Sequence, residues 1–169
     1  SAPFKVLGTI TDVLPSGDHT LEVGESKLIT WATSNALTRF RVFYRNETDG
    51  TTWNEISPAD PDGPGPVEGG VADTEFEWDP ILDDISNNVD FRVENYYDAV
   101  TYAESTANNY IKGKLDLDTP DDVTQTFYIT DTIPIKWYKT GLIGNLKIEY
   151  SAKGDFTDTA EIAPEVNPG

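Results

Sequence analysis

The sequence predicts an antiparallel β-sandwich that is repeated in tandem, with an incomplete second copy. The first observation behind this prediction is a recurring phrase, because Trp31 and Tyr44 return as Trp137 and Tyr150, 106 residues later in both cases. A period of this length matches one whole sandwich domain. The second observation is a succession of short alternating runs separated by turns, with no helical period. Two further pairs recur at an offset of 105 residues: Gly8 with Gly113, and Pro15 with Pro120.

The front half of the first repeat begins with the alternating run 9–14, which ends at the turn Pro15–Asp18. Ile29 and Trp31 lie two residues apart and therefore share one face of the next strand. The following strand alternates in the same way, and its inward residues are expected to be Phe40, Val42 and Tyr44. Its outward row contains three arginines, which we expect to pair with carboxylates on neighbouring strands: Arg39, Arg41 and Arg45. The alternative is that the row binds an anion or the carboxylate of a glycan.

The back half of the first repeat follows a proline-rich loop at residues 58–66, where regular pairing is impossible. Residues 76–80 give a strand that Pro80 ends, and residues 83–88 give a connection or a single helical turn. A further inward row runs through residues 89–93, and residues 101–104 form a shorter strand. We expect the aromatic core to contain the following residues and their later equivalents: Trp31, Tyr44, Trp53 and Trp78, with Trp137 and Tyr150.

These correspondences define the expected domains. Residues 8–112 form a complete sandwich, residues 113–169 form the front half of a second one, and residues 1–7 form the terminal strand of a preceding repeat. Three or four strands of the second copy are missing, so an apolar face and an unpaired strand edge are exposed. Either the natural chain continues, or another molecule supplies the missing strands, for which strand exchange between subunits is one route.

Composition excludes several classes of function. The net charge of −18 argues against nucleic acid, because phosphate binding needs Lys and Arg, and it disfavours anionic lipid for the same reason. The sequence has no cysteine for a disulfide or a thiolate metal site. Its one histidine, His19, cannot build a catalytic triad or a histidine metal site within the chain. No apolar run reaches the 18 residues of a membrane span. We therefore expect no enzyme activity and no direct membrane insertion.

Two groups of aspartates are candidate Ca²⁺ ligands, because oxygen donors held in a loop suit this ion. Neither group matches a complete calcium-loop signature, so we expect either no cofactor or a Ca²⁺ ion at one of them. Asp60 and Asp62 belong to the proline-rich loop. The second group lies at the junction between the repeats, where a cation would neutralise like charges: Asp116, Asp118, Asp121 and Asp122.

Three tyrosines are candidate ligand-binding residues, since an outward ring can stack on the face of a sugar: Tyr96, Tyr97 and Tyr102. The alternative is that these rings pack in the core or at a sheet edge, which a sandwich tolerates without a function.

The sequence resembles the immunoglobulin-like or fibronectin-type-III-like tandem repeats of large secreted prokaryotic surface proteins. The segments that carry the resemblance are Val23-Gly24, Ile29–Trp31, Arg41–Tyr44, Asp49–Ile56, Phe76–Pro80 and Phe91–Val93. The resemblance implies an extracellular or cell-surface location, many linked domains and no active site within the repeats. Two departures are Arg45, where the family has Ser, and the inserted loop at residues 58–66.

These observations predict that the chain is a non-enzymatic structural or interaction module of a long extracellular surface protein. It would act as a stalk, a filament segment or an adhesin repeat. Its expected partners are neighbouring repeats or subunits of the same protein, or a glycan or other cell-surface partner. Two alternatives remain open: a carbohydrate- or ligand-binding β-sandwich module, and an accessory domain of a secreted hydrolase.

Overall fold

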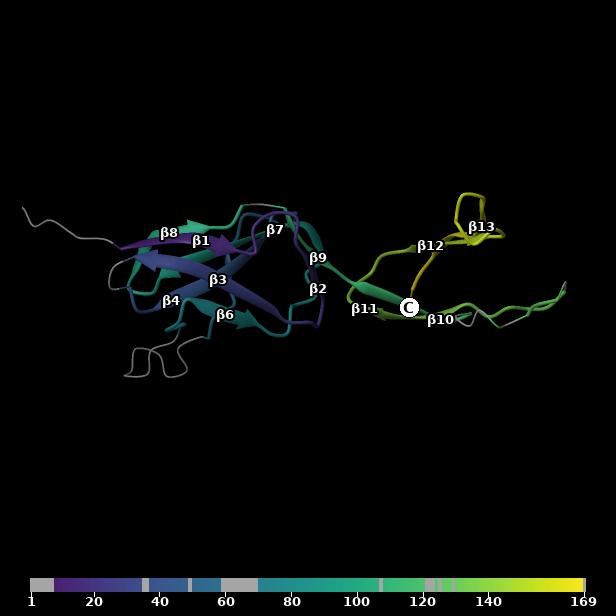
Figure 1. Cartoon of the computed structure of the whole chain (residues 1–169), viewed down its shortest axis with the longest axis horizontal. Coiled ribbons are helices and arrows are strands. Elements are labelled where there is room, and N and C mark those ends of the chain that lie inside the picture. Colours follow the sequence, from purple (N-terminus) through teal and green to yellow (C-terminus); the bar gives the residue numbers. More distant parts are fainter. Residues whose placement is uncertain are drawn as a thin grey trace, which may run out of the picture. The chain divides into compact units, whose positions relative to one another are not determined.

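The structure is a computed structural model and describes residues 8–34, 37–48, 50–58, 70–106, 108–120, 124, 126–128 and 130–168. Every regular element in these residues is a β-strand, and the chain divides into two units with the boundary between Lys112 and Gly113 (Figure 1). The predicted all-β class is confirmed. Within the described part of the chain, no helix is long and apolar enough to cross a bilayer. The expected strand in residues 1–7 lies outside the described residues.

The first unit consists of two sheets. One sheet has the strand order β1-β3-β6 and is antiparallel, and the other has the order β2-β9-β7-β4-β5 with β8 also paired to β7. The pairing of β2 with β9 is parallel, and the other pairings are antiparallel. The bounds are β1 Thr9–Leu14, β2 Thr20–Glu22, β3 Lys27–Ser34, β4 Phe40–Asn46, β5 Asn54–Glu55, β6 Glu75–Trp78, β7 Ser86–Asn95, β8 Asp98–Glu104 and β9 Asn109–Lys112.

This strand order defines the fold class. The chain changes sheet at each step from β1 to β4 and again before and after β6, whereas β4–β5 and β7–β8 are neighbours within one sheet. Such crossings between two packed sheets are typical of the sandwiches of immunoglobulin and fibronectin type III domains. The first unit is therefore an immunoglobulin-like or fibronectin-III-like sandwich. The alternative of a helical turn at residues 83–88 is wrong, because β7 already begins at Ser86.

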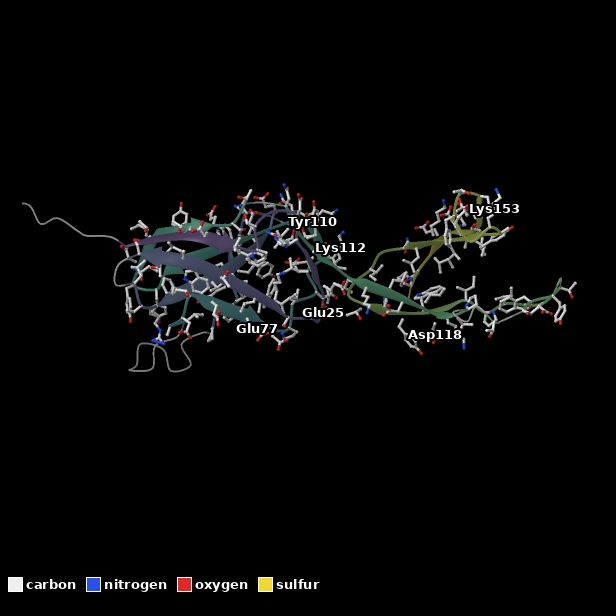
Figure 2. All side chains as sticks on the ribbon, in the orientation of Figure 1. Glu25, Glu77, Tyr110, Lys112, Asp118 and Lys153 are labelled. Atoms are coloured by element: carbon white, nitrogen blue, oxygen red, sulfur yellow. The ribbon has the colours of Figure 1, made fainter. Side chains whose placement is uncertain are left out.

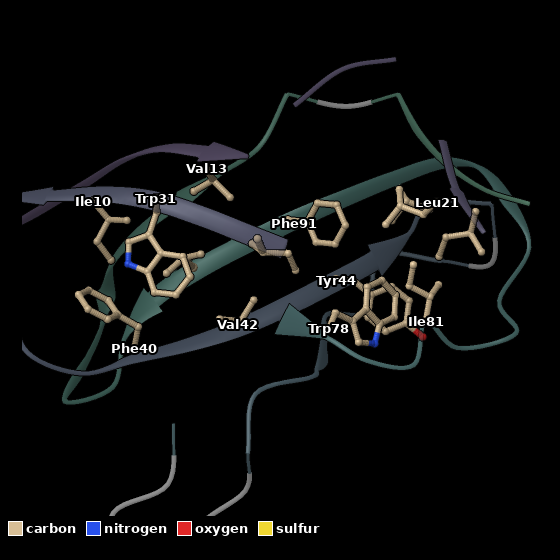
Figure 3. Packing of buried hydrophobic residues seen from close by; sticks show 14 residues of the cluster. Ile10, Val13, Leu21, Trp31, Phe40, Val42, Tyr44, Trp78, Ile81 and Phe91 are labelled. Carbon is tan, nitrogen blue, oxygen red and sulfur yellow. The ribbon is translucent and has the colours of Figure 1, made fainter. Parts of the chain in front are cut away.

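The core lies between the two sheets and is built around aromatic rings (Figure 3). Trp31 of β3 contacts Phe40 of β4 edge-on, with 5.3 Å between ring centroids. Trp78 of β6 lies between Tyr44 and Phe91, at 4.8 and 6.1 Å. Each such pair contributes about 0.5–1.5 kcal/mol beyond the burial of area. These contacts tie β3, β4, β6 and β7 together, so the core needs strands from both halves of the unit.

Trp53 is not a core residue, which corrects one expectation. It precedes the two-residue strand β5, is half-buried, and lies under the guanidinium of Arg45, whose Cζ is 4.6 Å from the ring centroid. The reason is that β5 is too short to impose an alternating pattern on its neighbours. The ring therefore packs against cations from β4 and β7 on the outside of the sheet.

The second unit has two sheets of two strands each, β10-β11 and β12-β13. Their strand pairing repeats that of the first unit. The pairs Thr9–Ser34 and Leu14–Thr30 correspond to Lys114–Thr140 and Thr119–Lys136. The pair Tyr44–Asn54 corresponds to Tyr150–Ala160. The front halves of both units therefore share one register, at offsets of 105 and 106 residues. The bounds are β10 Lys114–Thr119, β11 Lys136–Thr140, β12 Leu146–Ser151 and β13 Thr159–Val166.

Two equivalent glycines show that the packing is shared as well as the pairing. A Cβ added to Gly8 would collide with the side chain of Leu37, and one added to Gly113 would meet Ile143 at 2.7 Å. Leu37 and Ile143 are themselves 106 residues apart. A residue without a side chain is needed wherever another chain segment approaches so closely.

The units differ in their back halves. Among the described residues of the second unit, no strand corresponds to β6, β7, β8 or β9. The consequence is visible in β11, which begins at Lys136, the equivalent of Thr30. In the first unit, residues 27–30 of β3 pair with β6. In the second unit, β11 thus covers only the residues that pair with β10.

Candidate functional site

We define the outer face of the first unit as the outward side chains of β4, β5, β7 and β8, with the neighbouring Trp53 and Tyr96. Arg45 Nη2 lies 2.5 Å from Asp90 Oδ2 and 2.6 Å from Glu47 Oε1. Arg41 lies 3.8 Å from Glu94 and 4.0 Å from Glu55. The expectation of pairing with carboxylates of neighbouring strands is confirmed for Arg41 and Arg45.

The carboxylates of β7 are almost buried beneath these arginines. The side chains of Asp90 and Glu94 are 5% and 10% exposed. Burial raises the pKa of the Glu94 carboxyl above its usual value, although Arg92 and Arg41 act in the opposite direction. The hydrogen bond to Asp90 raises the pKa of the Arg45 guanidinium. The outer face is therefore a packed layer of charged side chains that joins β4 to β7.

Aromatic rings are part of the same layer. The guanidinium carbon of Arg92 lies 3.8 Å from the ring centroid of Tyr102, and that of Arg41 lies 4.8 Å from the centroid of Tyr96. A cation over a ring is attracted by the negative potential of its face. One side of each ring is consequently covered by the protein itself.

The three candidate tyrosines lie near one another at one end of this layer. Tyr102 pairs with Glu94 of β7, two residues from Tyr96, and the rings of Tyr96 and Tyr97 meet edge-on at 5.4 Å. Tyr97 is 60% exposed and Tyr102 is 48% exposed, whereas Tyr96 is half-buried. The structure thus brings Tyr96 and Tyr97 into contact, whereas Tyr102 packs against Arg92. Binding of a ligand by the three residues stays a prediction.

The candidate Ca²⁺ ligands are only partly described, since Asp60, Asp62, Asp121 and Asp122 lie outside the described residues. Asp116 and Asp118 (the latter labelled in Figure 2) both belong to β10, whose pairing with β11 is irregular between Leu117 and Thr119. Asp116 lies 3.5 Å from the amine of Lys114, and Asp118 accepts a 3.4 Å hydrogen bond from the Thr119 hydroxyl. No group of three or more carboxylates or histidines that could hold an ion occurs among the described residues. Binding of Ca²⁺ by the candidate aspartates therefore stays a prediction. It is tested by melting curves, because a bound ion should raise the melting temperature in calcium relative to chelator.

We define the open face of the second unit as the apolar side chains equivalent to the core of the first unit. Tyr150 is 53% exposed where Tyr44 is 6% exposed, and Leu115 is 47% exposed where Ile10 is 6% exposed. Tyr150 lines a hollow of about 520 Å³ on this side of the unit. Its lining includes Leu117, Ile135, Ile148, Tyr150 and Ile162.

The sequence places Asp90, Arg92 and Glu94 on the outside of β7, but sequence reasoning missed the burial of the two carboxylates and the identity of their partners. Asp90, Arg92 and Glu94 supply both the buried carboxylates and the cation between Trp53 and Tyr102. The signal was present, because these residues alternate with the inward row of the same strand. Aligning β4 antiparallel to β7 would have set Arg41 opposite Glu94 and Arg45 opposite Asp90.

Comparison with known proteins adds little to this description. No protein-family model matches the chain. No curated protein matches it either. Among solved structures, the fibronectin(III)-like modules of Clostridium thermocellum CbhA align with 94% of this chain and 76% of theirs, with a TM-score of 0.34 and 13% identity. A likeness this weak carries no inference about function, and the fold class rests on the strand order described above.

Proposed function

We propose that this chain is a non-enzymatic structural module of a long extracellular surface protein, acting as a segment of a stalk, filament or adhesin. The observation that carries the proposal is the recurrence of one strand register in both units. Repetition of one sandwich adds length and further attachment surfaces to a chain. Its partners are then neighbouring repeats or subunits of the same protein.

The outer face supports a structural role. A buried carboxyl with a raised pKa, such as Glu94, is a feature of many active sites. Here, however, Asp90 pairs with Arg45, and Glu94 pairs with Arg41 and Arg92. A general acid or base must reach a substrate. The contacts of these two groups instead link β4 to β7.

Antibody labelling of the source cells tests this proposal. Antibodies raised against residues 8–112 should label intact cells, and electron microscopy should place the label on extended surface structures. Labelling that appears only after lysis would contradict an extracellular structural role.

A second candidate function, glycan binding, is favoured by the exposure of Tyr97 and Tyr102, whose rings retain accessible area. A glycan array probed with the full chain would identify a ligand, and Tyr97→Ala and Tyr102→Ala should each remove its binding. Tyr138→Ala is the matched control, because Tyr138 is 67% exposed on β11 of the second unit. An array without signal, or equal loss in the control, would eliminate this candidate.

A further inference from the structure

We propose that the open face of the second unit binds an added segment equivalent to strands β6 to β9. One strand of this segment pairs antiparallel with β12 in the same register in which β7 pairs with β4. The occupant is a strand-forming back half from a repeat of the same type. This inference rests on the proposed function, because it specifies how such modules join one another.

The edge available for this entry is the second edge of β12. In the first unit, β4 is paired on both edges, with β5 on one and β7 on the other. In the second unit, β13 takes the place of β5, since the pair Phe43 and Glu55 recurs as Glu149 and Glu161. Within the described residues, no strand occupies the other edge of β12. Unpaired backbone donors and acceptors along such an edge are a template for strand addition.

The apolar side chains next to this edge indicate what the occupant must bring. In the first unit, Val42 pairs with Val93 and Tyr44 pairs with Phe91. The equivalents of Val42 and Tyr44 are Ile148 and Tyr150 (106 residues later), which line the hollow. An entering strand therefore needs apolar residues at two alternate positions, as Phe91 and Val93 are placed in β7.

Charge fixes the register more sharply than apolar contact does. Lys147 and Glu149 are the equivalents of Arg41 and Phe43, which pair with Glu94 and Arg92 of β7. A strand added in the same register therefore sets a Glu94-like residue opposite Lys147 and an Arg92-like residue opposite Glu149. Both positions then pair opposite charges across the strands, which is favourable. A slip by one residue is already excluded by the apolar pattern, because it would turn charged side chains toward the hollow. A slip by two residues keeps that pattern but sets Lys147 opposite Arg92 and Glu149 opposite Asp90, which are like charges. The β12 edge is thus complementary to the alternation Phe91-Arg92-Val93-Glu94.

Lys147 can leave its present carboxylate partners for one on the added strand. Its present contacts are 2.7 Å to Glu149 and 3.6 Å to Glu161, and its side chain is 51% exposed. Exposed ion pairs contribute little to stability, so turning toward a new carboxylate costs little. The β11 side is less suited to begin the docking, because Pro134, the equivalent of Leu28 in the stretch that pairs with β6, has no N–H to donate.

The direct experiment adds a synthetic polypeptide of residues 75–112, which contains β6 to β9, to the full chain. Amide hydrogen exchange of Leu146–Ser151 is measured with increasing polypeptide. We expect exchange of these amides to slow at least tenfold at saturation, while exchange of Phe40–Asn46, already paired on both edges, does not change. Unchanged exchange in β12 with millimolar polypeptide would overturn the proposal.

A charge swap tests the register. Lys147→Glu combined with Glu149→Lys should weaken binding roughly tenfold, because two attractive cross-strand pairs become repulsive. Binding should return when the polypeptide carries Arg92→Glu and Glu94→Lys. The matched control is Lys153→Glu with Asp155→Lys in the hairpin between β12 and β13, which should leave the Kd unchanged (Figure 2). Equal Kd values for all combinations would overturn the register.

Self-association is the remaining outcome to be measured. Sedimentation of the full chain without polypeptide shows whether a second copy already covers β12. Protection of β12 that rises with chain concentration would overturn the proposed occupant in favour of a second copy. None of these results bears on surface labelling of cells, so failure of this inference and failure of the proposed function are distinguishable.

Discussion

The two units of this chain begin in the same way and differ in how far their cores are closed. Tyr44 and Tyr150 pair with equivalent residues, Asn54 and Ala160, yet Tyr44 is 6% exposed and Tyr150 is 53% exposed. Pairing in the front half is thus specified by the hairpin between neighbouring strands. Burial depends on β6 and β7, which supply Trp78 and Phe91 in the first unit.

Strand length shows the same difference. β3 has 8 residues and pairs with both β1 and β6, whereas β11 has 5 residues and pairs with β10. The sequence Ile133-Pro134-Ile135 is equivalent to Lys27–Ile29, but it is not a strand. Two features separate this segment from β3: it has no partner equivalent to β6 among the described residues, and Pro134 has no N–H to donate to a ladder.

The largest expected difference between the units comes from the equivalent tryptophans. Trp31→Ala should destabilise the first unit by about 3–5 kcal/mol, because it leaves a cavity among rings that cannot collapse. Trp137→Ala should cost no more than about 1 kcal/mol, since Trp137 is only half-buried. Urea unfolding of both variants, followed by circular dichroism, measures the two effects. Equal losses would show that the two cores are alike.

Ion pairs should differ next. Asp90→Ala should cost about 1–3 kcal/mol, because it removes one of the two carboxylate partners of Arg45, at 2.5 Å, and leaves Glu47 at 2.6 Å. Glu149→Gln removes the exposed Lys147 pair at 2.7 Å and should cause no measurable change. Thermal melting of both variants gives the comparison. A large loss in Glu149→Gln would mean that the second unit is more tightly packed than described.

A smaller effect concerns pH. The pKa of Glu94 is raised in the folded state, so the native protein holds this proton more tightly than the unfolded chain. Stability from Glu94 is full below the usual carboxyl pKa of 4.5 and is lost as the pH rises through the folded-state value. The free energy of unfolding of Glu94→Gln, relative to that of the wild type, should therefore increase as the pH rises from 4 to neutral. Urea unfolding of both proteins across this range tests the sign, and a constant difference would refute it.

The sandwich could be predicted from sequence because its signals are local. Inward rows such as Phe40, Val42 and Tyr44 follow the period of a strand, and all three are buried. The paired arginines were predictable for the same reason. A residue that alternates with a buried row must lie on the outside, where an acidic chain offers carboxylates.

What could not be predicted depends on strands far apart in sequence. Trp53 has the composition of a core residue, but Arg45 and Arg92 from β4 and β7 hold it on the outer face. Asp90 belongs to the residue types that are usually exposed, and its burial follows from the arginine layer above it. Such environments are set by which strands become neighbours, and the periodicity of a single strand does not contain that information.

Amide hydrogen exchange on the full chain is the most direct test of the central claim, that two units of one register differ in closure. Amides of Val42 and Tyr44 should exchange only through unfolding of the whole first unit, whereas those of Ile148 and Tyr150 should exchange through local opening and be faster by orders of magnitude. Equal protection of these equivalent pairs would contradict the account.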